Sequence, residues 1–233
     1  MIQRWLLHIA CLCALAWPAF LNGQPFFFPD TTSYVRAADS AAYIFSGHRI
    51  STEWTDHYRH ALDPAAKQAK VRGHVAAHGN DIASQSIMAG RSPYFGALLW
   101  MTFLFGSFWL FVIAQALAAH WLVYLTLRMF EVLRPQALVA VAALLALGTS
   151  LPFFVGLLMP DLLAGLGMLA FLLLAIDRGR MARWERIGVA ALLLLSLLSH
   201  LTHIFAIGAM LVLLPIGMRL GGRPSSEWRG IFL

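Results

Sequence analysis

One acidic side chain marks the boundary between the first apolar segment and a long polar stretch. Asp30 lies in the sequence FPDTTSYVRAAD, residues 28–39, and Tyr34 and Arg36 follow it closely. A carboxylate held at a membrane surface is typical of a site that acts on a membrane-borne substrate. The same stretch also suits a turn, a helix cap or an interfacial anchor, because aspartate bonds readily to nearby backbone amides. Both interpretations of Asp30 stay open at this point.

A second acid, Asp161, directly follows Pro160 and begins a later apolar run. The topology derived below places it on the same side of the membrane as Asp30. Two acids on one face can share a divalent cation, or they can divide the roles of general base and orienting group. Asp161 also suits the N-terminal cap of a helix, where its charge stabilises the helix dipole. One residue can fill both roles.

Six of the nine histidines fall into two groups. His200 and His203 lie in an apolar surrounding, which predicts side chains that line a substrate cavity or form hydrogen bonds between helices. Two further pairs stand at helical spacing in the polar stretch: His57 with His60, and His74 with His78. No cysteine accompanies these pairs, so a solvated helix face is favoured over a metal site, and we assign no metal ligands.

The composition is that of a membrane protein. Of the 233 residues 60% are hydrophobic and 12% are charged, and the mean hydropathy is +0.71, whereas soluble domains carry about 25% charged residues. The net charge of +6 comes mainly from arginines between apolar runs, so we expect no nucleic-acid partner. Cys11 and Cys13 both lie in the first apolar run, which predicts packing residues rather than a disulfide.

The first apolar run covers residues 5–21 and is just long enough to cross a bilayer. A signal peptide is the alternative, but Pro-Ala-Phe-Leu at the end of the run is a poor cleavage site, so an uncleaved helix is favoured. Residues 22–94 are polar and predict a long extracytoplasmic loop with short helices. Within that loop residues 63–79 predict a helix, because the segment begins with Asp-Pro and ends at glycine.

Residues 95–218 predict a helical membrane bundle. Gly106 and Ser107 break the first long run, and the sequence around His200 breaks the last one. The predicted segments are a surface helix at 95–105, spans at 108–127, 136–151 and 161–176, an uncharged link at 152–160, and two short helices within 187–218. Together with the first run, this gives six spans with both termini in the cytoplasm, as the positive-inside rule favours. The predicted fold class is therefore all-α and polytopic.

Four motifs follow one another in the chain. They are PDTTSYVRAAD, then RSPYFGALLW leading into FLFGSFWLFVIAQALAAHWLVYLTLR, then MPDLLAGLGMLAFLLLA, and finally LLSHLTHIFAIGAML. Their order and spacing resemble the N-terminal half of the GT-C-type polytopic membrane glycosyltransferases, the class of the protein mannosyltransferases and lipid A aminoarabinose transferases. We therefore expect a fragment or a short relative of a larger protein.

The resemblance implies a multi-pass protein of the bacterial inner membrane. It would transfer a sugar from a polyprenyl-phosphate donor to an extracytoplasmic glycan, lipid or protein. Asp30 would be the catalytic acid residue and Asp161 its partner. The expected substrate-binding residues are Tyr34, Arg36, Arg91, His200 and His203. The Arg91 guanidinium matches phosphate oxygens, although an interfacial anchor explains it equally well. No cofactor is assigned, and a divalent cation is compatible with the two acids.

One departure from the family pattern concerns the catalytic acid. Many members carry a second acid beside the first, whereas Thr31 follows Asp30 here, and Asp39 could replace it only if the fold brings it round. A non-enzymatic scaffold or transporter subunit for envelope polysaccharide assembly is therefore the alternative function. Transport is less favoured than a scaffold, because the acids lie at span ends rather than within spans.

Overall fold

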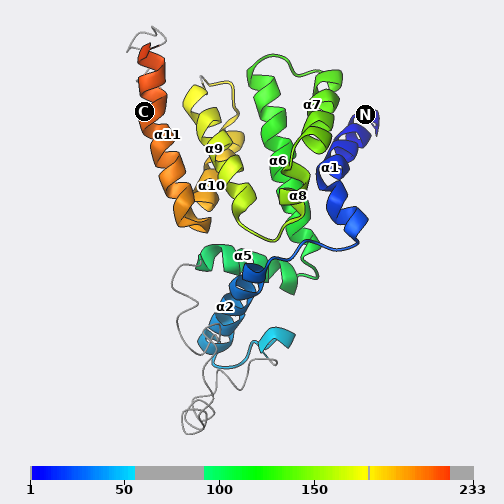
Figure 1. Ribbon diagram of the computed structural model, residues 1–233, viewed down its shortest axis with the longest axis vertical. Helices are drawn as coiled ribbons and strands as arrows, with labels where there is room; N and C mark the ends of the chain where they lie inside the picture. The colour runs from blue at the N-terminus through cyan, green and yellow to red at the C-terminus, as the bar shows by residue number, and fades with distance from the viewer. Residues whose placement is uncertain (1, 56–91, 178, 221–233) are drawn as a thin grey trace. The chain divides into compact units, whose positions relative to one another are not determined.

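The computed structural model describes residues 2–55, 92–177 and 179–220 (Figure 1). These residues are helical, apart from loops and one isolated β-bridge between Phe26 and Leu157, which confirms the all-α class. The chain divides into two compact units. We call Met1–Phe26 with Trp109–Leu233 the bundle unit, and Phe27–Phe108 the insert unit.

The bundle unit is built from one N-terminal helix and a continuous run of later helices. The helices are α1 (Ile2–Asn22), α6 (Trp109–Met129), α7 (Pro135–Gly148), α8 (Leu151–Gly156), α9 (Asp161–Ile176), α10 (Arg183–Ser199) and α11 (Leu201–Leu220). Helix α1 packs on α6, α7 and α8, while α9 packs on α10, α11 and α6. Figure 1 shows the α6–α7 and α9–α10 loops at one end of the bundle and the α10–α11 junction at the other.

The first helix is an integral part of this unit. Leu15 and Ala19 are buried against the neighbouring helices. After α1 the chain runs extended, and the backbone N–H of Phe26 donates to the carbonyl oxygen of Gly156 at 2.8 Å. In return, the N–H of Leu158 donates to the Phe26 carbonyl at 3.0 Å. The uncleaved helix stays a prediction from the sequence.

Several predicted boundaries are confirmed. The segment predicted at 161–176 is α9, the break at Gly106 is present with φ +133°, and the last apolar run divides at His200 into α10 and α11. The segment predicted at 136–151 ends earlier, because α7 stops at Gly148. Thr149 explains the early end, since its hydroxyl donates to the Leu145 carbonyl at 2.6 Å and accepts the N–H of residue 151.

The link predicted at 152–160 is only partly irregular. It contains the short helix α8, which Pro152 helps to start because its ring fixes φ and no N–H is needed in the first turn. Two helices, at Trp5–Asn22 and Trp109–Met129, are long and apolar enough to cross a membrane. Shorter apolar helices follow: Pro93–Leu104, Pro135–Gly148, Asp161–Ile176 and Leu201–Gly217. The six-span topology stays a prediction.

The insert unit contains α2 (Pro29–Phe45) and α5 (Pro93–Leu104). The sequence analysis places the start of a loop where α2 begins, but a 17-residue helix occupies this stretch. Pro29 supplies the first helical residue, and the Thr31 hydroxyl accepts the backbone N–H of Phe28 at 3.0 Å, which caps the helix. The helix predicted at 63–79 lies outside the described residues.

The two helices of the insert unit meet at a glycine. A Cβ atom on Gly96 would lie 2.8 Å from the carbonyl oxygen of Tyr34, so only glycine allows this approach. Beside it the rings of Tyr34 and Phe95 pack edge to face, with centroids 4.9 Å apart at 76°. Val35 and Leu99 are fully buried in the same core.

Candidate functional site

Three chemistry-bearing residues gather at the end of the bundle unit that holds the α10–α11 junction. Asp161 is the first residue of α9, His200 separates α10 from α11, and His203 lies in the first turn of α11. Asp161 and His203 interact electrostatically. The structure thus brings together three of the residues that the sequence analysis assigned to the site, and we call them the bundle-end cluster.

The hydrogen bonds of His203 fix its tautomer. Its Nδ1 atom lies 2.9 Å from the carbonyl oxygen of Ser196, and a carbonyl can only accept a hydrogen bond. Nδ1 therefore carries the proton and donates a hydrogen bond to the Ser196 carbonyl oxygen. In the neutral ring Nε2 is then unprotonated and can accept a proton or a hydrogen bond. His203 is 4% exposed, so its ring is held in place by packing as well as by this bond.

His200 has the opposite tautomer. The backbone N–H of Thr202 donates to His200 Nδ1 at 3.3 Å, and the Thr202 hydroxyl lies 2.8 Å from the same atom. Nδ1 is therefore an acceptor, and the proton of the neutral ring sits on Nε2. The two ring centroids are 5.6 Å apart. One imidazole thus offers a donor and its neighbour an acceptor, which suits a ligand carrying both a phosphate oxygen and a hydroxyl.

The helix break that presents these histidines has a local cause. The Ser199 hydroxyl donates back to the Leu195 carbonyl at 2.6 Å, which competes with the helical backbone bonds. The backbone of His200 then becomes extended, with φ −158° and ψ 140°. A second contact fixes α10 against α9, because a Cβ on Gly167 would collide with the Ser196 side chain.

Asp30, Tyr34 and Arg36 belong to the insert unit rather than to the bundle-end cluster. Asp30 is half-buried in the first turn of α2, where a carboxylate stabilises the helix dipole. Tyr34 is 1% exposed and contributes its ring to the core between α2 and α5. Arg36 is half-buried on the same helix. Arg91 and the four loop histidines lie outside the described residues.

Asp39 is a buried acid whose partners sequence reasoning missed. Its carboxylate is 2% exposed and accepts hydrogen bonds from the Thr52 hydroxyl at 2.7 Å, the Trp100 indole N–H at 2.8 Å and the Thr55 hydroxyl. Nine residues of helix correspond to about two and a half turns, so Asp39 and Asp30 lie on opposite faces of α2. Asp39 therefore does not supply the second acid beside Asp30.

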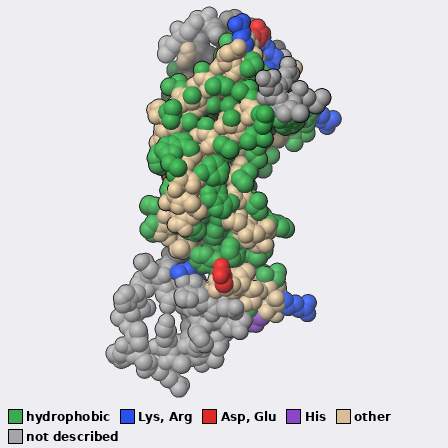
Figure 2. Space-filling model, turned by 90° about the vertical axis from the view of Figure 1, so that its right-hand side faces the viewer, with side chains coloured by type: hydrophobic (Ala, Val, Ile, Leu, Met, Phe, Trp, Pro, Cys, Tyr) green, Lys and Arg blue, Asp and Glu red, His purple; other side chains and the backbone are tan. Residues whose placement is uncertain are grey.

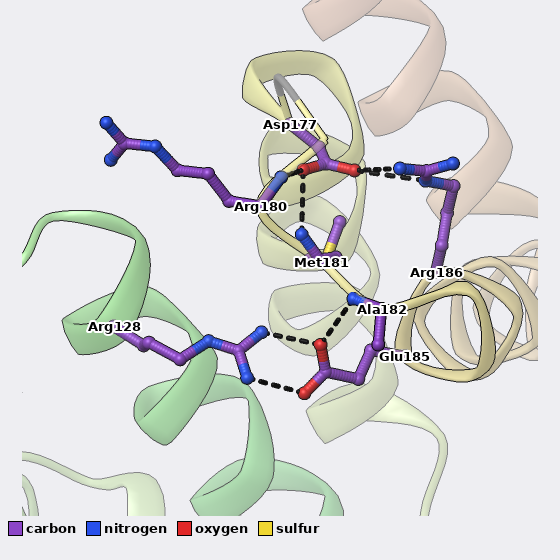
Figure 3. Close-up of polar contacts among 7 residues, drawn as sticks. All are labelled: Arg128, Asp177, Arg180, Met181, Ala182, Glu185 and Arg186. Carbon is purple, nitrogen blue, oxygen red and sulfur yellow. Dashed lines mark hydrogen bonds and ion pairs between the residues drawn. The ribbon is translucent and has the colours of Figure 1, made fainter.

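A further missed group is a network of charges at the other end of the bundle unit (Figure 3). Arg128 of α6 donates to both carboxylate oxygens of Glu185 at 2.7 and 2.5 Å, and the backbone N–H of Ala182 donates to Glu185 at 2.8 Å. These hydrogen bonds, that of Arg128 first, hold the pKa of the Glu185 carboxyl below its usual value. The arginine-rich loop was visible in the sequence, but its pairing across 57 residues was not.

Gln115 is a buried amide in the middle of α6. Its Nε2 group donates to the carbonyl oxygens of Val155 at 3.1 Å and Leu157 at 3.0 Å. Both carbonyls lie where α8 ends, so the amide satisfies backbone groups that the helix itself leaves open. Gln115 is thus a structural residue that anchors the end of α8 to α6.

The described residues contain no cluster of three or more histidine, cysteine, aspartate or glutamate side chains that could hold a metal ion. No protein family, curated protein or solved structure matches the chain. The resemblance to the GT-C glycosyltransferases therefore rests on the sequence motifs. The functional argument rests on the geometry of the bundle-end cluster.

Proposed function

We propose that this chain is a GT-C-type glycosyltransferase-like protein of the bacterial inner membrane. It transfers a sugar from a polyprenyl-phosphate donor to an extracytoplasmic glycan, lipid or protein. The observation that carries the proposal is the pair of histidines with opposite tautomers, placed beside Asp161 at one end of an apolar helical bundle. Such a pair offers a donor to a phosphate oxygen and an acceptor to a hydroxyl.

The reaction assigns a role to each acid. In an inverting displacement the acceptor oxygen attacks the anomeric carbon, the bond from that carbon to the phosphate oxygen breaks, and the acceptor hydroxyl gives up its proton. The family resemblance assigns this proton to Asp30, which belongs to the insert unit, so its role as base is proposed from the sequence motif alone. His200 Nε2 donates to the leaving phosphate, and His203 Nε2 accepts from a sugar hydroxyl. Asp161, at the start of α9, adds negative charge near His203.

The distribution of charge supports a membrane placement. The two long apolar helices α1 and α6 belong to one unit. Five arginines of this unit lie in or beside the α6–α7 and α9–α10 loops, and the bundle-end cluster lies at the opposite end (Figure 1): Arg128, Arg134, Arg180, Arg183 and Arg186. The positive-inside rule then puts the arginines and the N-terminus in the cytoplasm and the cluster outside. We propose six spans on this basis.

The test is a transfer assay with the full chain reconstituted in lipid vesicles. The donor is a radiolabelled polyprenyl-phosphate sugar, with envelope glycan and lipid fractions as acceptors. Asp30→Asn is expected to abolish transfer while the protein still resists carbonate extraction from membranes. Full activity in that variant would exclude Asp30 as the base, and carbonate release of the native chain would exclude membrane insertion.

A scaffold or transporter subunit for envelope polysaccharide assembly is the second candidate. The insert unit favours it, because the buried Asp39 carboxylate accepts hydrogen bonds from Thr52 and Trp100 within the unit rather than pointing outward. A scaffold would leave sugar transfer from total polyprenyl-phosphate lipids unchanged when the protein is added. Loss of polysaccharide export in its absence, with transfer unaffected, would favour the scaffold over the enzyme.

A further inference from the structure

The α6–α7 and α9–α10 loops form a surface that the proposed transfer reaction does not use. Figure 2 shows basic side chains gathered at this end of the bundle unit, above a body of hydrophobic side chains. We call this surface the basic end and define it by Arg128, Glu131, Arg134, Asp177, Arg180, Arg183, Trp184, Glu185 and Arg186. Its five arginines and three acids give a formal charge of 5 − 3 = +2.

Each acid of the basic end forms an ion pair with one arginine. The pairs are Glu185 with Arg128, Asp177 with Arg186 at 2.9 Å, and Glu131 with Arg180 at 2.9 Å. Two arginines remain. Arg134 and Arg183 are exposed, and neither has an acidic partner within the part of the chain that the structure describes. The surplus positive charge of the surface is therefore carried by these two guanidinium groups.

The described residues of the α9–α10 loop, which precede Arg183, form several hydrogen bonds (Figure 3). Asp177 accepts the backbone N–H groups of Arg180 at 2.9 Å and Met181 at 3.1 Å. The Arg180 guanidinium donates to the carbonyl oxygen of Met129 at 2.6 Å, which joins this loop to the end of α6. Residues held by such hydrogen bonds lose little conformational entropy when a ligand binds to them.

An exposed indole lies next to Arg183. Trp184 is 65% exposed and stacks on Trp121 of α6, with ring centroids 6.3 Å apart and an interplanar angle of 16°. Gly188 makes room for this arrangement, because a Cβ there would lie 2.7 Å from the Trp121 ring. Ile187 is 61% exposed on the same helix. Tryptophan beside arginine is the combination found at the level of lipid headgroups.

We propose that the basic end binds the headgroups of anionic phospholipids. Arg134 and Arg183 bond to the phosphate oxygens, since guanidinium groups match phosphate geometry. Trp184 and Ile187 lie at the boundary between headgroups and acyl chains. The inference rests on the membrane insertion proposed above, but it does not depend on the transfer reaction.

Lipid retention by the purified full chain tests the proposal. The protein is delipidated in detergent, incubated with equal amounts of phosphatidylglycerol and phosphatidylcholine, and analysed by native mass spectrometry. We expect preferential retention of phosphatidylglycerol. Each of Arg134→Gln and Arg183→Gln should weaken it about fivefold, because one basic side chain near an anionic surface contributes about that factor. Arg49→Gln in the insert unit is the matched control, since Arg49 is also exposed.

Three results would overturn the proposal. The first is equal retention of the two lipids by the native chain, and the second is unchanged retention in the Arg134→Gln Arg183→Gln double variant. The third is displacement of phosphatidylglycerol by millimolar inorganic phosphate, which would indicate a site for free phosphate rather than a lipid surface. Selective retention of phosphatidylglycerol by a chain without sugar-transfer activity would support lipid binding at the basic end and contradict the enzyme proposal. Equal retention of the two lipids by a chain that transfers sugar would overturn the lipid-binding proposal and leave the enzyme proposal standing.

Discussion

The guanidinium group of Arg128 meets the carboxylate of Glu185 in a two-fold hydrogen bond across 57 residues of sequence. Glu185 is 3% exposed, so the pair lies at the edge of the packed bundle rather than in free solvent. It connects the last turn of α6 to the first turn of α10. The position of these two helices along their common interface is thereby fixed.

Removal of one partner of this pair should destabilise the protein strongly. Arg128→Gln leaves the buried Glu185 carboxylate with only the backbone N–H of Ala182, at a cost on the order of 3 kcal/mol. Glu131→Gln breaks a surface pair with Arg180 and should change the free energy of unfolding by less than about 1 kcal/mol. Thermal unfolding in detergent measures both. Equal effects of the two substitutions would contradict the structure.

The same pair predicts a loss of stability in acid. The pKa of Glu185 is lower in the folded state than its unfolded value of about 4.3. The pair therefore contributes fully above that pH, and its contribution is lost as the pH falls through the folded pKa. Between neutral pH and about pH 3.5 the native protein should lose more thermal stability than Glu185→Gln. Parallel pH profiles would remove Glu185 as the cause.

Alanine substitutions at two glycines of α9 should change the stability of the protein in opposite directions. A Cβ on Gly167 meets Ser196, whereas a Cβ on Gly165 meets nothing within 4 Å. Gly167→Ala should therefore destabilise by about 1–3 kcal/mol through overpacking. Gly165→Ala should stabilise by up to about 1 kcal/mol through helix propensity. Ser196→Gly should restore stability to Gly167→Ala, and failure of that rescue would show that the contact is not the cause.

The two functions of the His203 ring can be separated by substitution. An asparagine amide can replace Nδ1–H toward the Ser196 carbonyl but has nothing in place of Nε2. His203→Asn should therefore retain most of the thermal stability and lose sugar transfer by about 100-fold or more. His203→Ala should lose both. Normal transfer in His203→Asn would reduce the histidine to a structural residue.

Substitutions of Asp39 and Asp30 should differ in their effect on the stability of the insert unit. Asp39→Asn places an amide N–H₂ among three hydrogen-bond donors, so it should cost about 1–3 kcal/mol. Hydrogen exchange in Pro29–Phe45 should then accelerate. Asp30→Asn should leave that exchange nearly unchanged, because Asp30 is only half-buried near a helix terminus. Faster exchange in Asp30→Asn would mean that this acid also holds the helix.

Local sequence signals predicted much of the bundle unit. Pro160 with Asp161 starts α9 at the expected residue, and Ser199 with His200 ends α10 within the predicted break. These features act within one helical turn, so they can be recognised in a single sequence. Hydrophobic runs likewise located α1 and α6.

Interactions across many residues could not be predicted in this way. Neither the Arg128–Glu185 pair nor the bond from Trp100 to Asp39 leaves a pattern in the local sequence. Helix α2 was missed for a different reason. Its first residues are of types that favour a turn. The helix is stabilised by the packing of Tyr34 and Val35 against α5, which the local sequence does not reveal.

The bridge between Phe26 and Leu157 has a consequence for biosynthesis. During translation α1 leaves the ribosome well before α8, and the backbone groups of Phe26 find their partners only at Gly156 and Leu158. The whole insert unit, α6 and α7 must therefore be made before the first helix is locked into its final place. Until then α1 lacks the contacts that α8 provides. A chain arrested while residue 156 is still inside the ribosome should consequently expose its first helix to cross-linking, and one arrested after residue 158 has emerged should protect it.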